Sequence, residues 1–397
     1  MDIYHHSEKF KQLLRKYEEL QENNISEIPC AEELTDVAEY FHMLGEEEKA
    51  LEVADYATRM YPSAVSPLAF KARMALLVDN NPQKADEIAE SIIDKNDVDF
   101  LYLKAEIMIA SSRPDDADKY LQACYDEIID SEAQEEFILD VAALFSDYEE
   151  IIYAEKWLNQ STKTEDKDYK ELKAQILKSH GNYVESETIL NELLDADPYF
   201  GPYWNQLAQS QFLRNDIQDS IISSEYSIAI NPNDEEAVLN KANGLFTLGN
   251  YDEALKYYER YKKLCHYADV SIIDVTIGHI YLMKGKALEA QEHYKKALAE
   301  SKDKPLTLIH IGISAFDNGY VEYAYRIFSN LLSDTSADWD IGYAYLARCC
   351  YELKKKKEFK KYLLIAIERN PEECLEVLSD LYPQGTDPKN YISSIRI

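Results

Sequence analysis

Apolar residues recur along most of this chain at the spacing of amphipathic helices, and the stretch 235–261 shows the pattern most clearly. Val238, Ala242 and Leu245 fall at i, i+4 and i+7, and a second apolar series follows within the same stretch. Gly249 stands between the two series, and glycine tolerates the left-handed backbone that ends a helix. The pattern therefore predicts two helices joined by a tight turn, which is a helical hairpin.

The hairpin recurs with a period of 34 residues. Pro198 and Pro232 keep this interval, and so do three pairs of small residues: Gly278 and Gly312, Gly285 and Gly319, and Ala290 and Ala324. A hairpin of this length can bury its apolar faces only against neighbouring copies. The repeat therefore predicts an all-α solenoid of stacked antiparallel helix hairpins.

Small residues occupy the predicted helix crossings, because two helices approach closely only where small side chains meet. On the first helices these places are held by Ala208, Ala242, Gly278, Gly312 and Ala347, and on the second helices by Ala50, Ala85, Ala117, Ala254, Ala290 and Ala324. Bulky residues are expected to fill the space between hairpins at Tyr258, Tyr294, Phe328 and Leu363.

This pattern resembles the tetratricopeptide repeat family. The family's small residue, turn glycine, second small residue and bulky aromatic match Ala242, Gly249, Ala254 and Tyr258, and its favoured tryptophan matches Trp204. We count about ten copies, with starts near residues 31, 66, 98, 135, 167, 201, 235, 271, 305 and 340. The resemblance implies a right-handed superhelical α-solenoid.

Four regions are expected along the chain. Residues 1–30 are predicted to form an N-terminal capping helix, and residues 31–200 to form acidic, partly irregular repeat units. In one irregular copy, Ser146-Asp147 stands where the turn glycine is expected. Residues 201–373 form the regular C-terminal units, and 374–397 a capping helix with a polar tail.

Composition and charge exclude several classes of protein. The 397 residues are 46% hydrophobic and 29% charged, which excludes a disordered chain, and 11 glycines are too few for an all-β fold. A net charge of −32 argues against nucleic-acid binding, and no apolar run is long enough to cross a membrane. Residues 1–20 lack the apolar segment of a secretory signal, and the six cysteines form no CxxC pair, so we expect a cytoplasmic protein.

The charge is distributed unevenly. Residues 1–134 hold 30 acidic and 13 basic residues, whereas residues 269–397 hold 19 and 17. The nearly neutral end contains one basic run, Lys354–Lys357 with Lys360 and Lys361. This run is either a solvated helix face and turn or a surface that steers a partner or self-association.

The sequence contains none of the familiar catalytic signatures, including phosphate-binding glycine loops, HExxH and GxSxG. His279, His293 and His310 lie in neighbouring units, but no cysteine or carboxylate accompanies them at ligand spacing. We therefore predict that the protein is not an enzyme and uses no cofactor or metal.

The family resemblance implies that first helices line a groove that binds peptides, with amide side chains holding the ligand backbone. The candidate groove residues in this sequence are Asn205, Gln209, Asn243, Phe246, His279, Met283, Ile313, Phe316 and Arg348. Other interpretations remain open: the amides are simply solvated, His279 is bonded between helices, and Phe316 packs against a neighbouring helix. The carboxylate clamp of the chaperone-binding subclass is not conserved, since Asn205, Gln209, Asn240, Ile272 and Thr276 occupy its places and supply no basic residue.

These observations predict a non-catalytic scaffold or adaptor that binds a peptide segment of another protein. The acidic half favours a basic partner. Two alternatives are a peptide-sensing regulatory receptor and a self-assembling structural protein. The tail 382–397 is a further candidate occupant of the groove, because Tyr391, Ile392 and Ile395 form an apolar stripe on it.

Overall fold

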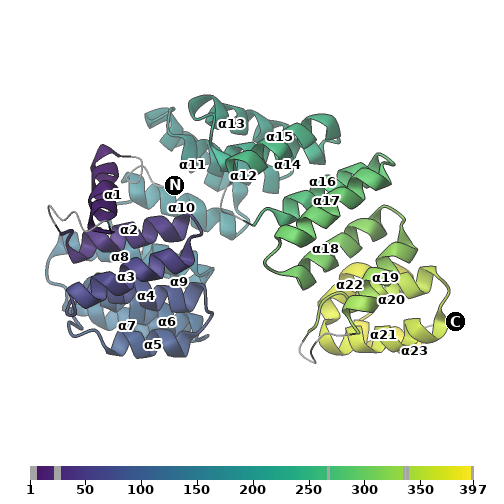
Figure 1. The fold of residues 1–397 in the computed structure, drawn as a ribbon, viewed down its shortest axis with the longest axis horizontal. Helices are drawn as coiled ribbons and strands as arrows, with labels where there is room; N and C mark the ends of the chain where they lie inside the picture. The colour runs from purple at the N-terminus through teal and green to yellow at the C-terminus, as the bar shows by residue number, and fades with distance from the viewer. Residues whose placement is uncertain (1–6, 22–27, 266–268, 334–335, 337–338, 395–397) are drawn as a thin grey trace. The chain divides into compact units, whose positions relative to one another are not determined.

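A computed structural model describes residues 7–21, 28–265, 269–333, 336 and 339–394. Across these residues the regular structure is helical, and within each of two units consecutive helices pair as antiparallel hairpins (Figure 1). The predicted α-solenoid is confirmed. The chain divides into two compact units, Met1–Leu248 and Gly249–Ile397. The boundary expected at residue 200 separates irregular from regular repeats and stays a prediction.

Unit 1 begins with the single helix α1 (Glu8–Gln21) and continues with helix pairs, which Figure 1 draws in purple to teal. The first helices of its repeats are α2 (Ala31–Met43), α4 (Val65–Leu77), α6 (Val98–Ala110), α8 (Ser131–Asp147), α10 (Lys167–Ser179), α12 (Gly201–Leu213) and α14 (Glu235–Thr247). Their second helices are α3 (Glu47–Met60), α5 (Pro82–Glu90), α7 (Pro114–Glu127), α9 (Ile151–Leu158), α11 (Tyr183–Ala196) and α13 (Ile217–Ile230).

Unit 2 begins with α15 (Tyr251–Leu264) and is drawn in green to yellow. Its hairpins are formed by α16 (Ser271–Met283) with α17 (Ala287–Glu300), α18 (Lys304–Asp317) with α19 (Val321–Leu331), and α20 (Tyr343–Glu352) with α21 (Lys356–Arg369). Three short elements and one further helix complete the unit: α22 (Pro371–Leu378), η2 (Ser379–Leu381), η3 (Pro388–Asn390) and α23 (Tyr391–Ser394).

Each repeat turns at one residue with positive φ. Glycine holds five of these turns, at 45, 181, 249, 285 and 319, and Asn80, Ser112, Glu149, Asn215 and Lys354 hold the others. The turn expected at Ser146-Asp147 lies elsewhere, because α8 runs through both residues and Glu149 adopts the left-handed conformation with φ of 60°.

The residues expected at the helix crossings and between hairpins are buried. Ala242 and Ala254 are 0% exposed, and Tyr258, Tyr294 and Phe328 are at most 3% exposed. These contacts form a series of small cores along the chain, each shared by neighbouring hairpins.

Both ends of the described chain carry caps. At the start, α1 buries Phe10, Leu13 and Tyr17 against the first hairpin, while the flanking residues 1–6 and 22–27 lie outside the described part. At the other end, Tyr391 lies in the core of the last hairpin, with its ring stacked on Tyr382 at 3.8 Å. This part of the tail covers the end of the array, and Ile395 lies outside the described residues.

Candidate peptide-binding surface

The nine candidate groove residues are divided between the two units. Unit 1 carries Asn205 and Gln209 on α12, and Asn243 and Phe246 on α14. Unit 2 carries His279 and Met283 on α16, Ile313 and Phe316 on α18, and Arg348 on α20.

In unit 2, His279 is bonded between helices, as one of the two sequence interpretations held. Its Nδ1 lies 2.9 Å from Ser314 Oγ and 3.2 Å from Asn318 Nδ2, and both partners belong to the neighbouring α18 or its C-terminal cap. Burial lowers the pKa of His279, although Asp317 acts in the opposite direction, and this shift favours the neutral form of the imidazole.

The Ser314–His279 contact brings together the residue types of a nucleophile and its base, but its surroundings differ from those of an active site. Ser314 is 4% exposed, and its Oγ also lies 2.7 Å from the hydroxyl of Tyr294. A reactive hydroxyl has to meet substrate, and this one is buried between two protein groups. The contact therefore serves to connect the α16–α17 hairpin with α18.

The other unit 2 candidates differ in the solvent exposure of their side chains. Arg348 bonds to Asp380, to Glu352 and to the carbonyl of Val377, so it connects α20 to the C-terminal cap. Ile313 and Phe316 are partly buried against the last core. Met283 is 46% exposed and is the candidate of this group with the most open side chain.

In unit 1, Asn205 holds the start of α14. It is 3% exposed, and its Nδ2 donates to Asp234 Oδ2 over 3.0 Å. Asp234 is the N-cap of α14, and its other oxygen accepts from the amide of Ala237. Asn205 therefore fixes one repeat on the next and does not face an open groove.

Gln209 lies between two charged side chains of neighbouring repeats. Its Oε1 accepts from Lys178 Nζ at 2.7 Å, and its Nε2 donates to Glu236 Oε1 at 2.6 Å. Burial lowers the pKa of Lys178, although Glu236 acts in the opposite direction. Both the oxygen and the nitrogen of the Gln209 amide therefore already have hydrogen-bond partners. A ligand could bond to this amide only by displacing Lys178 or Glu236.

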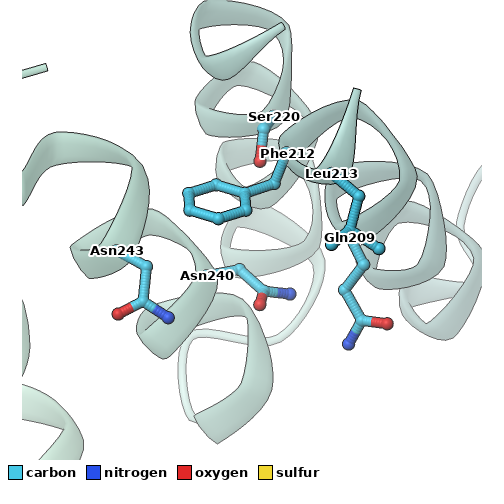
Figure 2. A pocket seen from close by; sticks show the side chains of 6 residues that line it. All are labelled: Gln209, Phe212, Leu213, Ser220, Asn240 and Asn243. Atoms are coloured by element: carbon cyan, nitrogen blue, oxygen red, sulfur yellow. The ribbon is translucent and has the colours of Figure 1, made fainter. Parts of the chain in front are cut away.

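A pocket of about 250 Å³ lies next to Gln209, between α12, α13 and α14 (Figure 2). Its lining residues are Gln209, Phe212, Leu213, Ser220, Asn240 and Asn243. Figure 2 shows the ring of Phe212 extending from α12 toward α14, where the side chains of Asn240 and Asn243 lie one turn apart. Leu213 is 54% exposed. The pocket therefore has an apolar wall, formed by Phe212 and Leu213 of α12, and a wall of amide side chains, formed by Asn240 and Asn243 of α14.

Asn240, which occupies a place of the carboxylate clamp but is not among the nine candidate groove residues, lines this pocket. Its Nδ2 is buried and has no hydrogen-bond partner among the described residues. An amide donor withdrawn from water without a partner is costly, so such atoms are rare unless another group completes them. The sequence could have indicated Asn240 by its position, because it precedes the candidate residue Asn243 by three residues and therefore shares its helix face.

An arrangement of this kind suits an extended peptide. An amide side chain offers both a donor and an acceptor to a peptide bond, and the neighbouring phenyl ring offers apolar area to a side chain. Binding of this type needs no titrating group, and none of the six lining residues is ionisable.

The described part of the chain contains no group of three or more histidine, cysteine, aspartate or glutamate side chains placed to hold a metal ion. It also contains no helix that is long and apolar enough to span a bilayer.

No family model and no curated protein matches the sequence. Several solved structures are similar in fold. A tetratricopeptide repeat protein from Parabacteroides merdae ATCC 43184 is 15% identical over 66% of this chain and 97% of its own, with a TM-score of 0.47. The Cut9–Hcn1 hetero-tetramer of APC/C contains a chain that is 16% identical over 86% of this chain and 81% of its own, with a TM-score of 0.37.

YrrB, described as a TPR protein with an unusual peptide-binding site, is 10% identical over 48% of this chain and 97% of its own, with a TM-score of 0.32. At these identities and TM-scores, the similarity supports no statement about the partners or the role of this chain. The resemblance to the tetratricopeptide repeat family rests on features of this chain, namely the period of 34 residues, the positive-φ turns and the small residues at the helix crossings.

Proposed function

We propose that the protein is a non-catalytic interaction scaffold, and that unit 1 binds an extended peptide segment of a partner protein at the pocket between α12, α13 and α14. The observation that carries the proposal is the buried Nδ2 of Asn240, which has no partner among the described residues and lines this pocket. A backbone carbonyl of the peptide would accept a hydrogen bond from it.

The apolar side of the pocket would hold one side chain of the peptide. Phe212 and Leu213 both line the pocket, and Leu213 is 54% exposed, so a bulky apolar side chain placed there removes apolar surface from water on both molecules. Asn243, on the same face of α14 as Asn240, would set the direction of the peptide backbone.

The charge of the surroundings favours a basic partner. Glu235 and Glu236 are exposed in the first turn of α14, about one turn N-terminal to the pocket residue Asn240. The first 134 residues of the chain add 30 acidic against 13 basic residues. A positively charged segment would therefore be drawn to unit 1, and the attraction would weaken with salt.

The test is a selection from a phage-displayed library of random dodecapeptides on the immobilised full-length chain. Affinities of the selected peptides are then measured by fluorescence anisotropy for the wild type, Asn240→Leu and Phe212→Ser. We expect each substitution to weaken binding about tenfold, because the first removes the donor and the second the apolar contact. Asn233→Leu is the matched control, since Asn233 is an exposed asparagine outside the pocket.

Other outcomes would contradict the proposal. Peptides that bind all four proteins equally would place the binding surface elsewhere, and Met283→Glu would then test the candidate in unit 2. Compaction on peptide binding, measured by small-angle scattering, would favour a regulatory receptor over a static scaffold. If the library yields no binding peptide and the molecular mass of the protein in solution rises with its concentration, self-assembly would be favoured.

A further inference from the structure

A second pocket lies at the edge of unit 2 where the hairpin turns are, and none of the nine candidate groove residues lines it. Its volume is about 430 Å³. It lies where the turn between α18 and α19 meets the C-terminal end of α20, and it is lined by Gly319, Tyr320, Val321, Glu322, Tyr323, Arg326 and Leu353.

Tyrosines give this edge an unusual amount of exposed aromatic surface. Tyr320 is 37% exposed and Tyr323 is 42% exposed, and both line the pocket. Tyr351, in the last turn of α20 close to Leu353 in sequence, is 48% exposed. Exposed aromatic side chains gathered at one place are typical of binding surfaces.

The basic run of the chain begins directly after the pocket residue Leu353. Lys354, Lys356 and Lys357 are exposed, and so is Arg326 inside the pocket lining. Among the described residues, none of these four side chains takes part in an ion pair. In a chain with a net charge of −32, unpaired basic groups concentrated beside one pocket need an explanation other than solubility.

Neighbouring contacts hold this edge in place. Lys355 Nζ lies 3.9 Å from the centre of the Tyr325 ring, and the Tyr325 hydroxyl donates to Glu358 Oε2 over 2.6 Å. These contacts fasten the start of α21 to α19, so the lysines are presented from a fixed backbone. A fixed backbone lowers the entropy that binding would otherwise cost.

We propose that this turn edge is a docking surface for an acidic peptide segment of a partner protein that carries a bulky apolar side chain. The apolar side chain enters the pocket between Tyr320 and Tyr323. The carboxylates of the segment pair with the exposed Lys356 and Lys357. Glu322 also lines the pocket, so the carboxylates lie along the lysine side of the edge and not beside Glu322.

This surface belongs to unit 2 and prefers the opposite charge from the pocket of unit 1. The proposal does not depend on peptide binding in unit 1. If both hold, the scaffold connects a basic segment on one unit with an acidic segment on the other.

The experiment uses the full-length chain and a fluorescein-labelled dodecapeptide in which a Leu-Phe pair is flanked on each side by five aspartate or glutamate residues. Binding is measured by fluorescence anisotropy at low ionic strength for the wild type, Tyr323→Ala and the double variant Lys356→Glu, Lys357→Glu. The matched control is Lys295→Glu, Lys296→Glu, an equal charge change at two adjacent exposed lysines on α17.

We expect the double variant at Lys356 and Lys357 to bind about tenfold more weakly and the control at Lys295 and Lys296 to bind within about twofold of the wild type. Tyr323→Ala should weaken binding of the same peptide, but not of a version with Ser-Ser in place of Leu-Phe. Three results would overturn the proposal: no binding by the wild type, equal binding of a version with glutamine and asparagine in place of the acids, or an equal loss in the control. A fall in molecular mass in the double variant, without a change in peptide binding, would assign the edge to self-association instead.

Discussion

Gly278 and Tyr294 are packed so closely that Gly278 has no room for a side chain. A Cβ atom added to Gly278 on α16 would lie within 3.0 Å of three ring carbons of Tyr294 on α17. The ring is 3% exposed and is held by the contact of its hydroxyl with Ser314 on the next hairpin. Gly312 and Phe328 repeat this relationship one copy later.

Gly278→Ala is therefore expected to destabilise the protein by about 2 kcal/mol, because the ring cannot move without losing its bond to Ser314. The measurement is the midpoint of urea unfolding followed by circular dichroism. In a Tyr294→Leu background, Gly278→Ala should lower the free energy of unfolding much less. This comparison isolates the contribution of the close contact between residue 278 and the Tyr294 ring. Helix propensity alone would make Gly278→Ala stabilising. A higher free energy of unfolding for this variant than for the wild type would therefore contradict the proposed close contact.

A buried carboxylate predicts how stability depends on pH. Asp274 is 0% exposed and accepts from Lys262 Nζ at 2.5 Å and lies 2.7 Å from His293 Nδ1. Burial by itself would raise the pKa of Asp274, but the bonds to His293 and Lys262 outweigh it and hold the pKa below its usual range. Because the folded pKa is lower than the unfolded one, this carboxylate stabilises the fold above about pH 4, and the contribution is lost as the pH falls further.

Asp274→Asn should lower the free energy of unfolding by about 2 kcal/mol at pH 7, since a charged acceptor is lost from a buried site. Urea titrations at a series of pH values should show the difference from wild type narrowing below about pH 4. The control is Asp195→Asn, at an exposed carboxylate on α11 that has no ion pair among the described residues. A difference that stays constant down to pH 3 would show that the charge of Asp274 does not contribute.

The turn at Glu149 is strained, and relieving it should stabilise the protein. Glu149 is exposed and adopts φ of 60°, a conformation that glycine takes at five of the other repeat turns. Glu149→Gly is expected to raise the free energy of unfolding by about 1 kcal/mol. Glu136→Gly, the same change at an exposed position inside α8, should lower it by about as much. Equal effects of the two substitutions would refute the role of the backbone conformation.

The stacked pair Tyr382–Tyr391 is expected to protect a thiol. Cys374 is 0% exposed in the core that contains Tyr391, and burial raises the pKa of Cys374 to about 12. Tyr391→Ala should speed the reaction of Cys374 with iodoacetamide, measured by peptide mass spectrometry, because it opens the cap. Cys30, which is exposed, serves as the internal reference.

Tyr199→Ala is the matched control for this experiment, since that tyrosine is 80% exposed. It should leave the labelling of Cys374 unchanged. Rapid labelling of Cys374 in the wild type would show that the tail does not cover the last hairpin.

The sequence by itself determined the hairpins, because their signals are local. The period of 34 residues, the turn at Gly249 and the small residue Ala242 all lie within one or two copies, and helix propensity and turn chemistry act over that range. The same reasoning placed Tyr294 and Phe328 between hairpins, where both are buried. It failed at Glu149, where a residue other than glycine accepts the left-handed turn.

Only the tertiary structure decided which polar groups are already paired and which await a partner. Gln209 is occupied by Lys178 and Glu236, residues 31 and 27 positions away, whereas the Nδ2 of Asn240 has no partner among the described residues. Sequence spacing places a side chain on a helix face, but the partners it meets there come from the adjacent repeat, and their identity depends on how the hairpins pack. The pocket beside Leu353 arises in the same way, because two turns that lie 34 or 35 residues apart in sequence meet only when the hairpins stack.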